Sequence, residues 1–150
     1  MRHAMLTPES STGIVMMDIM HQQLDDALRV TLDAEDADFT RQFHNLVTMM
    51  EEVFSTEESW MEEIDYPAIK AHREQHARAL SGMHHVDCSL MAGDVTTARK
   101  VVTILLPDWL RLHMATMDAA LAMYLQLSGM PQIETTLPPV QYLRWPEFRQ

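Results

Sequence analysis

The sequence predicts an all-α protein, an up-down-up-down antiparallel four-helix bundle with a proline-rich C-terminal arm. Apolar residues recur at intervals of three and four along most of the 150 residues, which is the spacing of an amphipathic helix. No segment shows the strict alternation of apolar and polar residues that is typical of strands. Only four glycines interrupt the chain, and the breaks between periodic segments are short. Consecutive helices should therefore pack as antiparallel neighbours.

The breaks between the helices have recognisable chemistry. The four predicted helices span about residues 15–32, 37–64, 67–91 and 95–127. The acidic run at 33–38 ends the first helix and offers N-caps for the second. The Asp-Tyr-Pro break at 65–67 places a proline at the first position of the third helix, and the Gly-Asp pair at 93–94 separates the third helix from the fourth. Pro107 should kink the fourth helix or restart it.

The C-terminal residues have a different composition. We assign residues 1–128 to the bundle and residues 129–150 to an extension whose prolines exclude a regular helix. The extension contains several large apolar side chains: Leu137, Val140, Tyr142, Leu143, Trp145 and Phe148. An arm packed along the bundle is the simpler expectation, and a contact with a partner or with a second copy of the chain is the alternative.

Charge and cysteine content exclude several classes of protein. The net charge of −11 leaves no basic patch for nucleic acid and no attraction to anionic membranes. Cys88 is the only cysteine, so neither an internal disulfide nor a thiolate metal cluster is expected. The N-terminus does not resemble a signal peptide, and no window approaches a membrane span. These features favour a soluble cytoplasmic protein.

Polar residues interrupt the apolar stripes at positions that should face the core. His72 and His76 are four residues apart and share one helix face. The other three helices each offer inward polar groups: His21, Glu57, and His113 followed by Asp118. Burying such groups costs free energy unless they are satisfied, so ligands from four helices suggest a shared metal centre. Imidazole and carboxylate ligands without thiolate favour iron, zinc or manganese.

Three stretches of the chain resemble the signature segments of bacterial hemerythrins. They are GIVMMDIMHQQL at 13–24, EESWMEEIDYPAIKAHREQH at 57–76 and DWLRLHMATMD at 108–118. Their order and spacing match the family over about residues 13–125, including the Tyr-Pro pair before HxxxH and the five-residue step from histidine to aspartate. A ferritin-like site would need Glu-x-x-His motifs on two helices, and the sequence has none.

The resemblance implies two non-haem iron ions and assigns their ligands by position. One iron would take three histidines, with two carboxylates bridging to the other iron: His72, His76 and His113, with Glu57 and Asp118. The second iron, where the family binds dioxygen, would take His21 and a histidine one turn before the bridging glutamate. That position is Val53, so the sequence lacks one expected ligand of the second iron.

Two acidic residues near His21 are candidates for supporting roles. Asp25 follows His21 by one turn, where an apolar side chain is expected, and antiparallel packing brings it toward the level of Val53. It is either a compensating ligand, or an acceptor for a metal-bound water, or a solvated acid beside Asp26. Asp18 is a candidate acceptor for the His21 ring, with a solvated first-turn acid as the alternative.

The other histidines are not expected at the centre. His44 is about half a turn out of phase with Val53. His84 and His85 fall off the face that carries His72 and His76.

The function that the resemblance implies is dioxygen binding for carriage, storage, delivery or sensing in a bacterial diiron protein. The missing imidazole at position 53 favours a competing hypothesis, an oxidase or peroxidase that uses dioxygen or peroxide with a separate reductant, because harder ligands stabilise ferric iron. A one-metal or metal-free interaction module is a third class.

Overall fold

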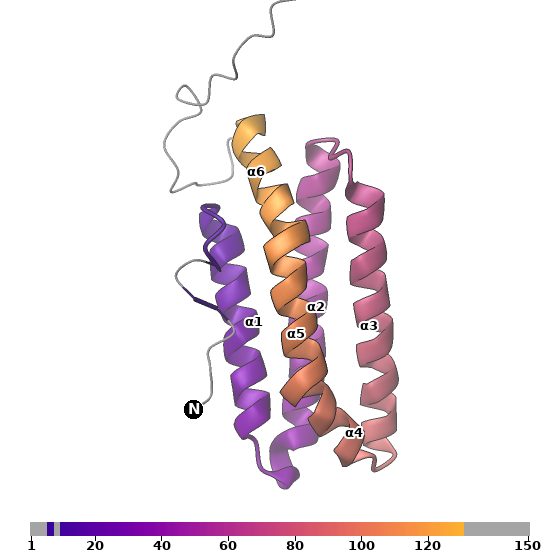
Figure 1. Cartoon of the computed structure of the whole chain (residues 1–150). Coiled ribbons are helices and arrows are strands. Elements are labelled where there is room, and N and C mark those ends of the chain that lie inside the picture. The colour runs from indigo at the N-terminus through magenta and orange to yellow at the C-terminus, as the bar shows by residue number, and fades with distance from the viewer. Residues whose placement is uncertain (1–5, 8–9, 131–150) are drawn as a thin grey trace, which may run out of the picture.

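The computed structural model describes residues 6–7 and 10–130, and over these residues the protein is all-helical, as predicted. Three long helices, α1 (Val15–Asp33), α2 (Asp36–Glu63) and α3 (Ile69–Met91), lie beside a fourth, segmented rod. The fourth rod comprises α4 (Val95–Lys100), η2 (Val101–Leu105), α5 (Leu106–His113), η3 (Met114–Asp118) and α6 (Ala119–Ser128). The chain direction alternates from each rod to the next (Figure 1). The arm predicted for residues 129–150 falls, from residue 131 onward, outside the described part of the chain.

The corner between α1 and α2 is tied to the fourth rod by one arginine. Arg99 of α4 donates to the backbone oxygen of Ala34 at 2.9 Å and to Asp36 Oδ1 at 2.7 Å. Its guanidinium also lies 4.1 Å from the centre of the Phe39 ring, at the start of α2. Asp36 and Asp38 in the first turn of α2 suit the positive end of the helix dipole.

The turn between α2 and α3 differs from the sequence prediction by two residues. α3 begins at Ile69, whereas Pro67 was expected at the first helical position. Asp65 adopts a left-handed φ of 50°, and the Tyr66 N–H returns to Met61 O at 2.9 Å. Ile69 N–H then donates to Tyr66 O at 3.1 Å, so Pro67 lies in the turn that precedes the helix. The proline thus fixes the entry to α3 without being part of it.

The fourth rod is interrupted where the sequence predicts it. η2 is a π-helical turn, in which the Leu106 N–H donates to Val101 O, five residues earlier. Pro107 follows at the start of α5, where its missing N–H would leave a gap in a regular helix. The rod changes direction between α4 and α5 (Figure 1). The π turn accommodates the proline and aims α5 along the bundle.

The buried apolar residues form two clusters with a polar layer between them. One cluster includes Leu24 of α1 and Phe54 of α2, and the other includes Met17 of α1 and Met61 of α2. Between these positions lie the buried polar residues His21 and Glu57. The bundle therefore places its ligand candidates in a layer with apolar packing on both sides. None of the described helices is long and apolar enough to pass through a membrane.

Candidate metal centre

Five buried side chains from three of the rods meet in the polar layer. They are Glu57 from α2, His72 and His76 from α3, and His113 and Asp118 from the fourth rod. Each offers a ligand atom within 4.8 Å of every other. All five were singled out from the sequence, and none is more than 2% exposed.

The imidazole nitrogens of this cluster surround the two carboxylates. Asp118 Oδ1 is 3.0 Å from His72 Nε2 and 3.1 Å from His113 Nε2. Glu57 Oε2 is 3.2 Å from His76 Nε2 and 3.5 Å from His72 Nε2. His76 Nε2 and His113 Nε2 are 3.2 Å apart. Three imidazole nitrogens and one oxygen from each carboxylate therefore converge in one buried volume.

His21 of α1 contacts the other oxygen of each carboxylate. Its Nε2 lies 2.9 Å from Asp118 Oδ2 and 3.7 Å from Glu57 Oε1. Both carboxylates thus direct one oxygen toward the three-histidine group and the second oxygen toward His21. This division would allow cations on either side to share the two carboxylates.

The π turn η3 brings His113 and Asp118 onto the same side of the rod. In a regular α-helix a step of five residues overshoots a full turn by about 140°, which would point the two side chains in different directions. A π turn closes its hydrogen bonds over five residues, so the same step returns close to the starting direction. η3 spans Met114–Asp118, the interval in question. The local departure from α-helix is therefore what positions Asp118.

Four residues that orient the ligand rings were not found by sequence reasoning. Glu58 Oε1 accepts from His76 Nδ1 at 3.0 Å, and Gln75 Oε1 accepts from His113 Nδ1 at 2.9 Å. Phe54 stacks on the His76 ring at 4.0 Å and 2°, and Trp109 stacks on the His113 ring at 4.5 Å and 12°. A proton held at Nδ1 leaves Nε2 free as a ligand nitrogen. The four-residue spacing of Trp109 and His113 was a usable signal, because such pairs are neighbours on a helix.

Asp18 does not hold the His21 ring. Its carboxylate accepts hydrogen bonds of 2.8 Å from the Ser11 hydroxyl, the Thr12 hydroxyl and the Thr12 backbone N–H. His21 Nδ1 is buried and has no hydrogen-bond partner within the described part of the chain. The predicted contact is therefore wrong, because Asp18 instead ties the segment before α1 to the first turn of that helix.

Asp25 is buried, which excludes the interpretation of a solvated acid. Its side chain is 2% exposed, and Arg29 Nε lies 3.6 Å from Asp25 Oδ2. The neighbouring Asp26 side chain is 55% exposed. Val53, at the position that lacks the expected histidine, is buried one turn before Glu57. Asp25 and Val53 thus both belong to the interior of the bundle.

Unsatisfied buried atoms indicate that the cluster fits a metal. Within the described residues, both Glu57 carboxylate oxygens, Asp118 Oδ1 and His72 Nε2 are buried without a hydrogen-bond partner. Buried polar atoms in native proteins nearly always have one. A cation between these atoms would satisfy all of them together. The donor set of imidazole and carboxylate suits iron, zinc or manganese.

The pKa values of the cluster reflect the close packing of opposite charges. Burial opposes the charged form of His21 and His72, but their contacts with Asp118 and Glu57 raise both pKa values to about 9. Burial raises the pKa of each carboxylate, and the charge of Asp118 adds to this effect at Glu57, but contacts with the histidines hold both pKa values below the usual range. In the absence of metal, the imidazolium forms of His21 and His72 are therefore favoured beside the two carboxylates.

The metal-free protein should lose stability as the pH rises from 6.5 to 9. A histidine whose pKa is higher in the folded state stabilises it fully below the unfolded pKa of 6.5, and this contribution is lost as the pH passes the folded pKa of about 9. The expected loss in the free energy of unfolding is on the order of a few kcal/mol. Thermal melts with a chelator at pH 6 and pH 9 test this. An unchanged or rising melting temperature would contradict it.

The same cluster should take up metal more tightly at higher pH, with release of protons, because the ligand nitrogens must be neutral. Calorimetry in buffers of different ionisation enthalpy measures the protons released.

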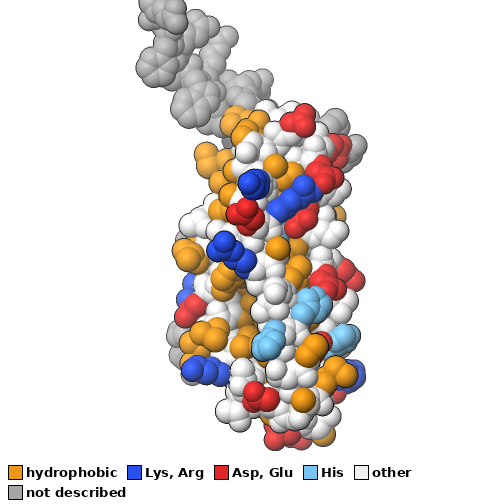
Figure 2. Space-filling view, turned by 90° about the vertical axis from the view of Figure 1, so that its right-hand side faces the viewer, with side chains coloured by type: hydrophobic (Ala, Val, Ile, Leu, Met, Phe, Trp, Pro, Cys, Tyr) orange, Lys and Arg blue, Asp and Glu red, His pale blue; other side chains and the backbone are white. Residues whose placement is uncertain are grey.

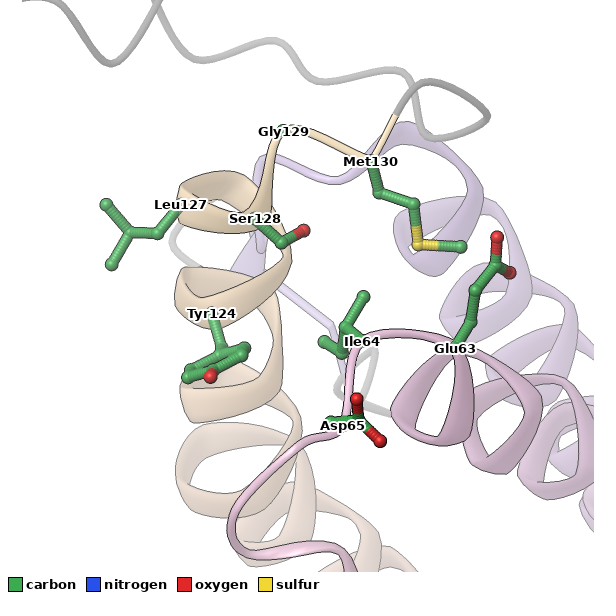
Figure 3. Close-up of a pocket in the computed structure, with 8 residues that line it drawn as sticks. All are labelled: Glu63, Ile64, Asp65, Tyr124, Leu127, Ser128, Gly129 and Met130. Atoms are coloured by element: carbon green, nitrogen blue, oxygen red, sulfur yellow. The ribbon is translucent and has the colours of Figure 1, made fainter.

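A surface cavity of about 590 Å³ lies apart from these ligands. The turn after α2 and the end of α6 line it, with Tyr124 and Leu127 opposite Glu63, Ile64 and Asp65 (Figure 3). None of the six metal-ligand candidates contributes to its wall. The candidate metal centre therefore does not open into this cavity.

Comparison of the sequence with known protein families agrees with this cluster of buried histidines and carboxylates. Residues 12–125, most of the described chain, match the family described as the hemerythrin HHE cation binding domain. The chain belongs to the hemerythrin family. It is also 30% identical to a bacteriohemerythrin from Ralstonia nicotianae over 117 residues, which cover 78% of this chain and 85% of that protein. A hemerythrin with valine at position 53 departs from the pattern that the family resemblance implies, and the structure places that valine in the interior.

Proposed function

We propose that this hemerythrin is a non-haem diiron protein that binds dioxygen, with an altered second iron position. The observation that carries the proposal is the division of the carboxylate oxygens. Asp118 and Glu57 each direct one oxygen to the three-histidine group and one to His21. The iron pair would supply the electrons and the coordination site for dioxygen, and the protein supplies the ligand geometry and the surrounding apolar layer.

The two iron positions are supported unequally. At the first position, His76 and His113 are oriented through Nδ1 by Glu58 and Gln75, and each ring is stacked on an aromatic side chain. At the second position, His21 Nδ1 has no such partner among the described residues. Outer contacts of this kind change metal affinity by about 10- to 100-fold. The first position should therefore fill first and hold its iron more tightly.

We further propose that Asp25 compensates for the missing imidazole, as a ligand of the second iron or as the acceptor for its bound water. Asp25 lies one turn from His21, and both side chains are buried on the inward face of α1. A carboxylate ligand would favour the ferric state. A buried carboxylate at this position therefore supports the second candidate function, an oxidase or peroxidase with a separate reductant.

Spectra of iron-loaded protein under argon, then oxygen, then argon distinguish these functions. Reversible dioxygen binding predicts an absorption change that reverses when oxygen is removed. The oxidase predicts consumption of oxygen and reductant without a lasting spectral change. An interaction module predicts neither, and iron content well below one per chain would contradict the proposal as a whole.

Replacing Val53 with histidine should raise the iron content at the second position. The imidazole would replace a buried apolar side chain one turn before Glu57, where the family resemblance places a ligand. We expect more iron per chain and a longer-lived oxygen-dependent spectrum, measured by elemental analysis and absorption. Val47→His is the matched control, because Val47 is equally buried in α2 and should lose stability without gaining iron. Equal iron in Val53→His and the wild type would show that position 53 does not face the second iron.

A further inference from the structure

Three histidines outside the central cluster gather on one face of the bundle. His44 of α2 and His84 and His85 of α3 are all exposed. Figure 2 shows histidine side chains gathered in the lower half of the face that α3 presents. None of them contributes to the buried cluster, so another explanation for their grouping is needed.

A buried carboxylate of α3 holds one of these histidines. Asp87 is 7% exposed, and its Oδ2 accepts from His44 Nδ1 at 2.9 Å. The other oxygen, Asp87 Oδ1, is buried without a hydrogen-bond partner within the described residues. A carboxylate at Nδ1 fixes the ring and leaves Nε2 available, which is how metal-binding histidines are commonly held. The His44 side chain is 66% exposed, so the ring is accessible from solvent.

A second pair of the same kind crosses the same seam. His84 precedes Asp87 by three residues and is its neighbour on α3. The His84 ring contacts the Glu51 carboxylate, and Glu51 lies two turns after His44 on the same face of α2. Each helix therefore contributes one imidazole and one carboxylate to the α2–α3 seam. Because the two helices are antiparallel, the imidazole of each helix contacts the carboxylate of the other: His44 with Asp87, and His84 with Glu51.

We propose that this seam is a separate metal site, which binds a divalent transition ion such as zinc through His44 and His84, with Asp87 as the positioning residue for His44. Imidazole nitrogen suits zinc, copper and nickel. The present contact of His84 with Glu51 is between half-exposed side chains, and such surface pairs contribute little stability, so a metal can displace it. The net charge of −11 favours accumulation of cations at the surface.

Zinc titration of the iron-loaded full chain tests this proposal. We expect one additional zinc per chain with iron content unchanged, measured by calorimetry and by elemental analysis after desalting. The His44→Ala, His84→Ala double variant should lose this zinc and keep its iron. The matched control, His85→Ala, should retain the zinc, as should Cys88→Ser, which removes the exposed thiol one turn beyond His84. All substituted side chains are exposed, so the fold should persist.

The Asp87→Asn variant tests the positioning role. Zinc affinity should fall by about 10- to 100-fold, as for other outer contacts of ligand histidines. When His44 is already alanine, Asp87→Asn should cause no further loss of zinc affinity. If Asp87 had only a structural role, the substitution would lower zinc affinity in both backgrounds. The proposal is overturned if the wild type binds no additional zinc, if the double variant retains it, or if Cys88→Ser or His85→Ala alone abolishes it. Loss of iron along with zinc in the double variant would equally overturn a separate site.

Discussion

Replacing His76 with alanine should remove most of the bound iron and lower the melting temperature of the iron-loaded protein. His76 Nε2 faces both Glu57 and His113 in the cluster, so the first iron position would lose a central ligand. A metal bound only by the folded state stabilises it by about 2.7 kcal/mol when free metal is 100 times Kd. For a chain of this length, that corresponds to a melting temperature lower by about 5–10 °C.

The measurement compares melting temperatures with and without iron in the wild type and the variant. The variant also loses the stacking contact with Phe54, which lowers its melting temperature even without iron. The result is therefore decided by how much iron raises the melting temperature of each protein. His85→Ala controls for the loss of an imidazole at an exposed position. A His76→Ala protein with full iron content would disprove the ligand assignment.

Replacing Asp25 with leucine should lower the iron content from near two per chain toward one, while the metal-free protein becomes more stable. Asp25 is buried beside the half-exposed Arg29. Replacing buried charged groups with apolar groups of similar volume often stabilises a protein, here by on the order of 1 kcal/mol. If Asp25 supports the second iron, the iron-loaded protein should change in the opposite direction and lose stability.

Asp26→Asn is the matched control for this prediction, because Asp26 is the neighbouring acid, is exposed and also contacts Arg29. It should leave the iron content unchanged and alter stability by no more than about 0.5 kcal/mol. Full iron content in Asp25→Leu would mean that Asp25 does not support the second iron.

The predictable part of the structure is the part that periodicity controls. Helical spacing placed α1, α2 and the end of α3 within a residue or two, and it identified the buried faces that carry His21, Glu57 and His76. Period alone does not specify local departures from the α-helix, so the π turns were not predicted. Nor does it specify how the non-helical segments fold against the helices. The contacts of Asp18 with Ser11 and Thr12, in place of its candidate role beside His21, were therefore not predicted.

The outer contacts of the ligand rings illustrate the same limit. Glu58 and Gln75 adjoin ligands in sequence, yet their orientation toward His76 and His113 depends on how α2, α3 and the fourth rod are rotated about their axes. Rotation of a helix by one residue changes the direction of a side chain by about 100°. Sequence patterns locate the buried face of a helix only to within about one residue of rotation. They therefore predict ligands at the centre of that face better than the residues at its border that contact the ligand rings.

The π turn η3 also has a consequence for how the fourth rod can vary. It contains one residue more than a regular helix needs, and the wider turn takes up that residue without changing the phase of the segments on either side. Upstream, Leu110 packs in one apolar cluster, and downstream, Leu121 and Leu125 pack in the other. Deleting a single residue between 114 and 117 would restore a continuous helix in which His113 and Asp118 are four residues apart, a step that also returns to within about 40° of its starting direction. Both halves of the rod would then stay in register with the bundle, so the fourth rod can gain or lose this residue without repacking either apolar cluster.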